Sequence, residues 1–397
     1  MTCIAGCTVP TESVSVLMIR QDWLDQLGLE APTNLEEVEQ VALAFKEAKL
    51  GGENTVPILG PGNDNRMYTT FYDGFNCLFG LDAVFTAMDA YPGFFYTDDN
   101  GEVVYGSNTK ETRDALVLLN KWYEEGILDP ETGVRGSGFE PVDGGTAGMF
   151  FGCWWNIGFG NPASFYNDEN ADWRAYPIFN ENGDWQIKTG DISAGSRLCI
   201  NANASDDVAH AVMIILNVLQ AETDSLESTT EDSAWQPLRI TIPAADFVDV
   251  ARQYCIDILE GDCDVDLYKG NPLYNEAWTS ARYVKDIIPN YTKGQTEFGR
   301  PDFVISQEDS NWQAVYSWLI GNGPYATTEA AKTVRPAVSY YTPAMEMYWD
   351  NLESVEKSTL LSIIVGQQDI STFDAYVDQW MAEGGETILA EVAGELG

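Results

Sequence analysis

The sequence of 397 residues contains a single histidine, His210. This excludes a multi-histidine zinc site, and any histidine-based serine or cysteine triad would depend on this one side chain. Ser205 can cap a helix just before it, Asp206 and Asp207 suit the positive helix end, and apolar residues follow at helical spacing. We therefore interpret His210 as an ordinary helix residue.

Positive charge is also scarce, with 21 Lys and Arg against 62 Asp and Glu and a formal net charge of −41. Nucleic acids and anionic lipid surfaces attract clustered Lys and Arg, so neither is expected as a partner. Apolar residues make up 45 % of the chain and charged residues 21 %, which is typical of a protein with a packed core. The acidity therefore does not indicate disorder, and the length suggests two or three domains.

Long apolar runs are absent. The best candidate, residues 211–219, falls well short of the roughly 20 residues that a membrane span needs, so no membrane span is predicted. The seven cysteines include no CxxC pair and do not resemble a disulfide framework. We expect most of them to be small buried side chains, and the spacing leaves a bridge between Cys255 and Cys263 open.

Short apolar strands alternate with helices that carry start signals. Thr33 with Glu36, and Asn108 with Glu111, predict capping boxes at the starts of two amphipathic helices. Strands are predicted at residues 13–20, 55–59, 144–151, 174–179 and 197–202, and further helices from residues 205 and 371. This alternation indicates an α/β architecture. The polar, acidic segment 221–234 is the best candidate for a domain boundary.

Two signals that could indicate chemistry are weak. Asp262, Asp264 and Asp266 are spaced like the first ligands of a calcium loop. The sixth position of that loop has no glycine, and Leu273 stands where a bidentate glutamate belongs, so a solvated acidic turn is favoured. A glycosidase needs only two placed carboxylates, which 62 acidic residues could provide without any motif. That alternative stays open.

Aromatic residues are plentiful, with 12 Trp and 19 Tyr. Sugar rings stack their apolar C–H faces on such side chains. Trp154 and Trp155 follow a predicted strand directly, and strand alternation would point their indoles to opposite faces. Ligand stacking and core packing are equally consistent with Trp154, whereas core packing is favoured for Trp155. Tyr68, Tyr72 and Tyr341, taken singly, are more typical of structural residues.

Three segments in order along the chain carry a family resemblance. The first runs from Ile19 to Val38 (IRQDWLDQLGLEAPTNLEEV) and the second from Gly145 to Trp155 (GTAGMFFGCWW). The third covers residues 363–388 and includes FDAYV, a tryptophan and a Gly-Gly pair. Together they resemble bacterial extracellular solute-binding proteins of family 1, the substrate-capturing lipoproteins of carbohydrate ABC importers.

The resemblance implies a periplasmic-binding-protein type II fold, with two α/β lobes, a ligand cleft between them and a hinge. Residues 15–222 would form the first part of one lobe, 223–335 part of the other, and 336–397 C-terminal helices that return to the first. Residues 1–14 would be a remnant of the N-terminal lobe and hinge. Relatives carry a lipoprotein signal and a larger section of the other lobe, so we expect an N-terminally truncated chain with one incomplete lobe.

The resemblance also implies positions for ligand-binding side chains. Trp154 matches the family's sugar-stacking position, and Trp155 lies beside it. Tyr68 falls in a segment where relatives present an aromatic ring, and Tyr341 precedes the C-terminal lobe-crossing helix. Polar contacts are expected from Asp64, Asn65, Arg66 and Ser196. Residues 48–55 lack the ligands of the calcium loop that many relatives carry, so no metal is expected, and no cofactor or catalytic residue either.

These features predict a non-enzymatic extracellular receptor. It would capture a carbohydrate, expected to be an oligosaccharide, and deliver it to the permease subunits of an ABC importer. The receptor is expected to be a monomer, tethered to the cell membrane as a lipoprotein in its full-length form. The alternative is a glycan-processing enzyme that uses paired carboxylates. A receptor for a peptide or lipid-linked solute is a third candidate, because a fold does not fix its ligand.

Overall fold

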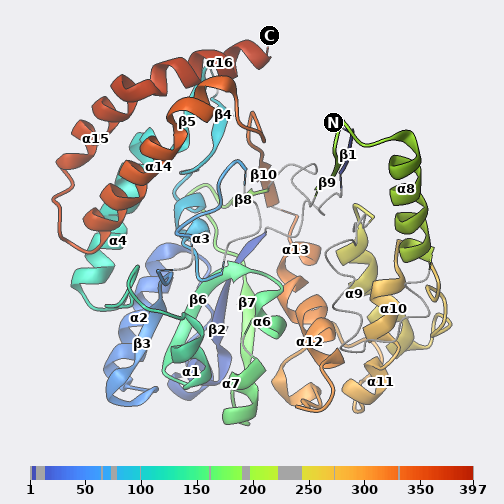
Figure 1. Ribbon diagram of the computed structural model, residues 1–397. Helices are drawn as coiled ribbons and strands as arrows, with labels where there is room; N and C mark the ends of the chain where they lie inside the picture. Colours follow the sequence, from blue (N-terminus) through green and yellow to red (C-terminus); the bar gives the residue numbers. More distant parts are fainter. Residues whose placement is uncertain are drawn as a thin grey trace.

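The computed structural model describes residues 2–5, 14–63, 66–72, 78–98, 100–160, 162–189, 197–221, 244–271, 273–329 and 331–396. Figure 1 shows two bodies side by side, a larger one that contains a sheet and a smaller one made mainly of helices. The chain passes between them at β8 (Trp185–Lys188) and β10 (Ala331–Val334), which pair in parallel. The fold is α/β, as the alternation of strands and helices predicts.

The larger body is built on a four-stranded sheet in the order β3-β6-β2-β7. These strands are β3 (Val56–Leu59), β6 (Ala147–Cys153), β2 (Ser15–Arg20) and β7 (Trp173–Tyr176). β2 pairs antiparallel with both of its neighbours, whereas β3 and β6 run in parallel. The predicted strands are confirmed at these positions, with ends that differ by a few residues.

The sheet is buried on both faces. Successive side chains of a strand point to opposite faces. Along β2, Leu17 and Ile19 join one buried cluster, while Val16 and Met18 join another. The apolar run of β2 therefore contributes to two cores, which explains why it does not alternate with polar residues.

Helices cover both faces of this sheet. Those that bury side chains in the cluster of Leu17 are α1 (Gln21–Leu27), α2 (Leu35–Ala48), α3 (Asp82–Thr86) and α4 (Lys110–Glu124). Those that bury side chains in the cluster of Val16 are α5 (Phe139–Asp143), α6 (Asn156–Phe159) and α7 (Pro162–Asn167). The remaining elements here are η2 (Gly52–Asn54), β4 (Phe95–Thr97), β5 (Val103–Tyr105) and η3 (Gly106–Asn108).

The predicted helix caps lie one residue further along the chain. Asn34 caps α2 by accepting from the Glu37 backbone N–H at 3.0 Å, and the Glu37 carboxylate accepts from the Thr33 N–H at 2.7 Å. At α4 the capping oxygen belongs to Thr109, which accepts from the Thr112 N–H. The type of cap was therefore predicted correctly. Neighbouring polar residues can each cap the helix, and the sequence does not show which of them does so.

The C-terminal helices pack on the larger body. They are α14 (Pro343–Ile364), α15 (Thr372–Trp380), the π-turn η10 (Met381–Gly385) and α16 (Glu386–Leu396). Trp349, Trp380 and Ile388 join the same cluster as Leu17. Within η10, Gly384 takes a φ of 134°, which bends the chain before α16 begins.

The smaller body is a helical assembly that packs directly on the larger one. Its elements are α9 (Phe247–Glu260), α10 (Asn275–Ala281), α11 (Val284–Ile287), η8 (Arg300–Asp302), α12 (Asn311–Tyr316), the π-turn η9 (Ser317–Gly321) and α13 (Gly323–Thr327). The rings of Trp312 and Tyr316 pack edge-on against Phe165 of α7. The Tyr316 hydroxyl also donates to the Trp173 carbonyl at 2.7 Å. One core therefore spans both bodies.

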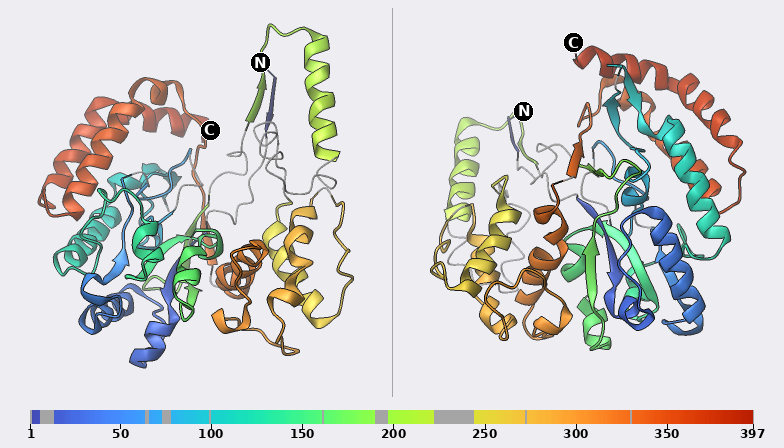
Figure 2. Two further views of the ribbon diagram at one scale, coloured as in Figure 1. Left: turned by 60° about the horizontal axis from the view of Figure 1, so that its bottom comes forward. Right: turned by 180° about the vertical axis from the view of Figure 1, so that it is seen from behind.

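The helix α8 (Asp206–Ala221) follows β9 (Arg197–Ile200), which pairs antiparallel with β1 (Thr2–Ala5). These elements lie on the side of the smaller body (Figures 1 and 2). The sequence-based boundary was placed at residue 222, whereas we propose that the chain crosses between the bodies between β8 and β9. The polar composition of the segment 221–234 predicts that this segment is exposed to solvent. It does not show which of the two bodies the preceding helix, α8, joins.

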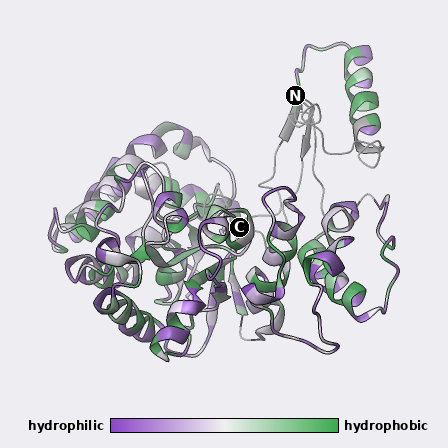
Figure 3. Ribbon diagram, turned by 90° about the horizontal axis from the view of Figure 1, so that it is seen from below, coloured by the Kyte–Doolittle hydropathy of each residue, from purple (hydrophilic) through white to green (hydrophobic). Residues whose placement is uncertain are grey.

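α8 exposes much of its apolar surface. Val208, Ile214 and Val218 are each 52–53 % exposed, although a helix this apolar is normally buried. Neither buried cluster of the described residues includes a side chain of α8. Figure 3 shows the hydrophobic segments of this helix standing away from both packed bodies.

The described cysteines differ in their exposure and in whether they are disulfide-bonded. Cys255 is buried and free, Cys263 is partly exposed and free, and so the two are not bridged. Cys199 is exposed and Cys153, at the end of β6, is disulfide-bonded. Among the described residues, the structure contains no helix long and apolar enough to cross a membrane.

Candidate functional site

Trp154 lies in the core and not on an open surface. It is 3 % exposed and belongs to the cluster that joins the two bodies. Gly321 of η9 packs so closely over it that a Cβ at this glycine would lie 2.1 Å from the Trp154 carbonyl oxygen. The smaller body therefore covers the expected stacking position.

Trp155 is more exposed than Trp154. The composition had instead favoured core packing for Trp155 and left ligand stacking open for Trp154. β6 ends at Cys153, and Trp155 adopts a helical backbone conformation with φ −72° and ψ −18° as α6 begins. Strand alternation therefore does not apply across this pair. The Trp155 carbonyl accepts from the Ser317 hydroxyl at 3.0 Å, which adds a further contact between the two bodies.

Tyr68 is a core residue as well, 4 % exposed, so the expectation of a ligand-facing ring is corrected. Its hydroxyl donates to the buried carboxylate of Glu356 on α14. Tyr105 and Ser107 donate to the same carboxylate at 2.8 and 2.7 Å. Burial raises the pKa of Glu356 despite these three hydrogen bonds, and burial also raises the pKa of Tyr68. The Tyr68 hydroxyl is therefore engaged within the core, where its ring also packs edge-on against Phe85 at a centroid distance of 5.8 Å.

A partly exposed aromatic and charged group lies nearby, and we call it the Tyr341 cluster: Arg66, Tyr72, Tyr341 and Glu353. The rings of Tyr72 and Tyr341 have centroids 5.2 Å apart. Arg66 donates to the Tyr72 hydroxyl at 3.0 Å and pairs with Glu353 at 3.1 Å. The Tyr72 hydroxyl also donates to Glu353. Arg66 and Tyr341, which were predicted as ligand-binding residues, therefore lie in one cluster. Tyr72 and Glu353, which were not predicted, connect them.

The charges of this cluster are matched. Burial opposes the ionised form of Glu353, but hydrogen bonds from Tyr72 and Lys357 together with the charge of Arg66 lower the pKa of its carboxyl. Burial raises the pKa of Tyr341 and of Tyr72, so both stay neutral donors. Tyr341 is 38 % exposed. An aromatic face beside a guanidinium and a carboxylate suits a ligand with an apolar ring face and hydroxyl groups.

Three of the predicted residues cannot be placed. Asp64, Asn65 and Ser196 lie outside the described residues. Asp64 and Asn65 directly precede Arg66 in the chain, so they adjoin the Tyr341 cluster in sequence.

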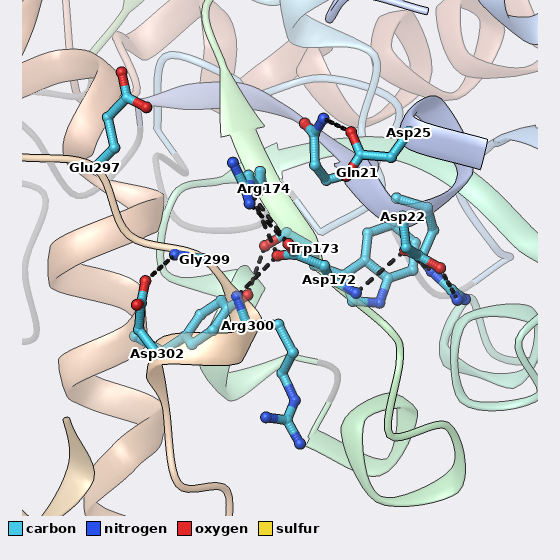
Figure 4. Close-up of polar contacts among 12 residues, drawn as sticks. Gln21, Asp22, Asp25, Asp172, Trp173, Arg174, Glu297, Gly299, Arg300 and Asp302 are labelled. Atoms are coloured by element: carbon cyan, nitrogen blue, oxygen red, sulfur yellow. Dashed lines mark hydrogen bonds and ion pairs between the residues drawn. The ribbon is translucent and has the colours of Figure 1, made fainter. Parts of the chain in front are cut away.

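The two bodies also meet at the start of β7 (Figure 4). Asp172 accepts from the Arg174 guanidinium at 2.9 Å and from the Arg300 backbone N–H at 3.0 Å. Arg174 lies against Gly299, where a Cβ would come within 2.5 Å of its guanidinium. No sequence signal marks this contact, because its residues are about 130 positions apart and form no motif.

The acidic segment in the smaller body forms a turn. The Asp264 carboxylate accepts from the Asp266 N–H at 2.9 Å, and Asp266 accepts from the Trp278 indole at 3.0 Å. Within the part of the chain that the structure describes, no group of three or more His, Cys, Asp or Glu could hold a metal ion. The acidic segment therefore forms hydrogen bonds both within itself and to α10.

Comparison with known proteins places this geometry in context. An HMO binding, ABC-transporter associated solute binding protein from Bifidobacterium longum infantis matches with a TM-score of 0.59 and 16 % identity, over 99 % of this chain and 75 % of that one. The ABC-transporter substrate binding protein FusA of S. pneumoniae, in complex with fructo-nystose, matches at 0.57 and 12 %, over 98 % and 74 %. The alginate-binding protein AlgQ2 matches at 0.54 and 14 %, over 98 % and 73 %.

The sequence comparisons are more limited. No protein-family model matches the chain. Lipoprotein LipO of Bacillus subtilis is 30 % identical over 143 residues, which span 34 % of this chain and only a quarter of the length of that protein. The structural likeness extends over nearly the whole chain, and we conclude that the chain has the fold of ABC-transporter solute-binding proteins.

Proposed function

We propose that this chain is the ligand-capturing receptor of an ABC importer, and that its ligand is a carbohydrate, with an oligosaccharide as the expected form. The observation that carries this proposal is the likeness over 98–99 % of the chain to solute-binding proteins. The neighbours are described as binding HMO, fructo-nystose and alginate. The receptor is not an enzyme in this proposal, and it acts by binding alone.

The Tyr341 cluster supports the choice of ligand. Tyr341 offers an aromatic face to a sugar ring, and Arg66 and Glu353 offer a donor and an acceptor to its hydroxyls. Trp155 provides a second partly exposed ring, and Asp64, Asn65 and Ser196 remain proposed ligand contacts. Trp154 and Tyr68 would take part only indirectly, by supporting these residues from the core.

The proposal extends to partners and location. The receptor would deliver its ligand to permease subunits as a monomer, outside the cytoplasmic membrane and tethered there as a lipoprotein. The lipoprotein relative and the disulfide of Cys153 support an extracellular site, because disulfides persist in oxidising compartments. We also propose that the second lobe is incomplete in this chain. The exposed apolar side chains of α8 and the 73–75 % coverage of the solved neighbours support this.

Isothermal titration calorimetry against a panel of purified oligosaccharides tests the function. We expect a saturable heat of binding for at least one glycan, with an equimolar endpoint and unchanged sugar after recovery. Absence of binding across the panel by a protein shown to be folded would contradict the proposal. Recovery of shorter sugars would instead support the glycan-processing alternative, so chromatography of the recovered glycan accompanies each titration.

A further inference from the structure

The two strands that cross between the bodies form a single ribbon. β8 leads out of the larger body, and β10 leads back from α13 to the C-terminal helices. They pair in parallel with Lys188 opposite Val334, and the Thr189 N–H donates to the Val334 carbonyl at 3.1 Å. A change in the relative position of the two bodies would act on this ribbon, because two of the strands that connect them are paired here.

A lysine is buried at the end of β8. Lys188 is 3 % exposed, and its ammonium donates to the Thr69 carbonyl at 2.6 Å, the Pro92 carbonyl at 2.6 Å and the Asp82 carboxylate at 2.8 Å. The ring of Phe94 lies 4.5 Å from the same nitrogen. A buried ammonium is costly unless all of its donors are used, and here three acceptors match its three N–H groups.

The partner carboxylate holds the same segment of chain. The other oxygen of Asp82 accepts from the Thr69 backbone N–H and from the Thr69 hydroxyl, each at 2.8 Å. Thr69 is therefore bound on its N–H, its hydroxyl and its carbonyl by one buried ion pair. It lies between Arg66 and Tyr72 in the chain, the two members of the Tyr341 cluster that come from the segment 66–72.

We propose that Lys188 is a positioning residue that ties the segment 66–72 to the crossing strand β8. The inference rests on the proposed function for its biological meaning, because that segment carries Arg66 and Tyr72 of the candidate binding cluster. A ligand that shifts the segment moves the Thr69 carbonyl, and Lys188 passes this displacement to β8. The relative position of the two bodies and the arrangement of the Tyr341 cluster are then coupled through the Lys188 side chain.

Amide-resolved hydrogen exchange of the ligand-free protein tests this coupling. In Lys188→Met we expect at least tenfold faster exchange both at Thr69 and at Thr189, while amides of the central sheet, such as Leu17, keep their rates. The control is Lys332→Met on the paired strand β10, where the lysine side chain is 59 % exposed and pairs with Asp184. It makes the same chemical change on the same ribbon, and we expect rates at Thr69 within twofold of the wild type.

A second variant separates coupling from stability. Lys188→Met leaves Asp82 buried without its cation, so we expect a lower melting temperature. The double variant Lys188→Met with Asp82→Asn removes that charge and should recover part of the melting temperature. Its exchange at Thr189 should stay fast, because methionine has no donor for the Thr69 and Pro92 carbonyls.

Two outcomes would overturn the inference. One is faster exchange at only one of the two ends, Thr69 or Thr189, in both the single and the double variant. The other is wild-type exchange at both ends in the double variant, which would show that the unpaired carboxylate alone caused the change. The experiment contains no ligand, so failure to bind any glycan would contradict the proposed function and leave this test valid.

Discussion

Glu353 and Glu356 lie three residues apart on α14, and each accepts a hydrogen bond from a tyrosine of the segment 66–72. Tyr72 donates to Glu353 at the partly exposed Tyr341 cluster, and Tyr68 donates to Glu356 in the core. Residues at this spacing lie on the same side of a helix. Helix α14 therefore contacts the segment 66–72, nearly 300 positions earlier in the chain, at two points. The contact at Glu353 is partly exposed, and the contact at Glu356 is buried.

The first prediction concerns Tyr341. Replacement by alanine removes the exposed ring, and we expect glycan affinity to fall about fivefold, equivalent to about 1 kcal/mol of stacking. Calorimetry with a glycan that binds the wild type measures the change. The control is Tyr340→Ala, because Tyr340 is similarly exposed but donates to Glu395. An equal loss in both variants would contradict a specific role for Tyr341.

The second prediction concerns the close approach of Gly321 to Trp154. A Cβ at Gly321 would also meet the Ile157 side chain at 3.0 Å. We expect Gly321→Ala to destabilise the fold by about 1–3 kcal/mol, as overpacking does, measured by urea denaturation. Gly323, two residues later, has open space at its Cβ position and serves as control. Gly323→Ala should leave the unfolding free energy within about 1 kcal/mol of wild type.

The third prediction concerns the pH dependence of stability at Glu356. Its pKa in the folded protein is raised above the ordinary value of 4.5, mainly by burial, so the folded state binds its proton more tightly than the unfolded state. Its contribution to stability therefore increases as pH falls through the folded pKa toward 4.5. Urea denaturation of wild type and Glu356→Gln at several pH values isolates this contribution.

We expect the stability of the wild type relative to Glu356→Gln to increase as pH is lowered in that window. The other carboxylates are common to both proteins and cancel in the difference. A difference that shrinks toward acid pH would contradict the raised pKa. A matched control is Glu353→Gln, since the folded pKa of Glu353 is lowered and its contribution should change in the opposite direction.

The fourth prediction concerns the exposed face of α8. Ile214, Ile215 and Val218 are 48–53 % exposed, so replacing each with serine should change stability by no more than about 0.5 kcal/mol. Binding of a hydrophobic dye should fall, because these side chains form an accessible apolar surface. Ile363→Ala is the buried control and should cost about 2–5 kcal/mol. Unchanged dye binding would contradict the exposure of this helix.

Local structure followed closely from the sequence. The apolar runs at residues 13–20 and 144–151 became β2 and β6, and the helix from residue 110 buries Leu116, Leu119 and Trp122 as its periodicity indicates. These features depend on neighbouring residues only, so the pattern contains the necessary information. Helix caps were misplaced by one residue because several adjacent polar side chains can serve.

The candidate site was predicted only in part. Arg66 and Tyr341 lie in one cluster, but the contact runs through Tyr72, which had been interpreted as a structural residue, and through Glu353, which carried no sequence signal. The family resemblance implied that Tyr68 presents its ring to the ligand, whereas its side chain lies in the core. Tyr72, four residues away in the chain, has the same chemistry and also donates to a glutamate of α14, and only the tertiary packing decides which of the two tyrosines is buried.

The sequence by itself determined the charge of −41 and the α/β pattern. These properties depend on composition and on spacing along the chain, which folding does not alter. The tertiary structure alone decided that Gly321 covers Trp154, that Glu356 collects three hydroxyls and that Lys188 binds Thr69. Each of these contacts joins residues more than 100 positions apart, and such pairs are selected by the packing of whole elements, about which local pattern carries no information.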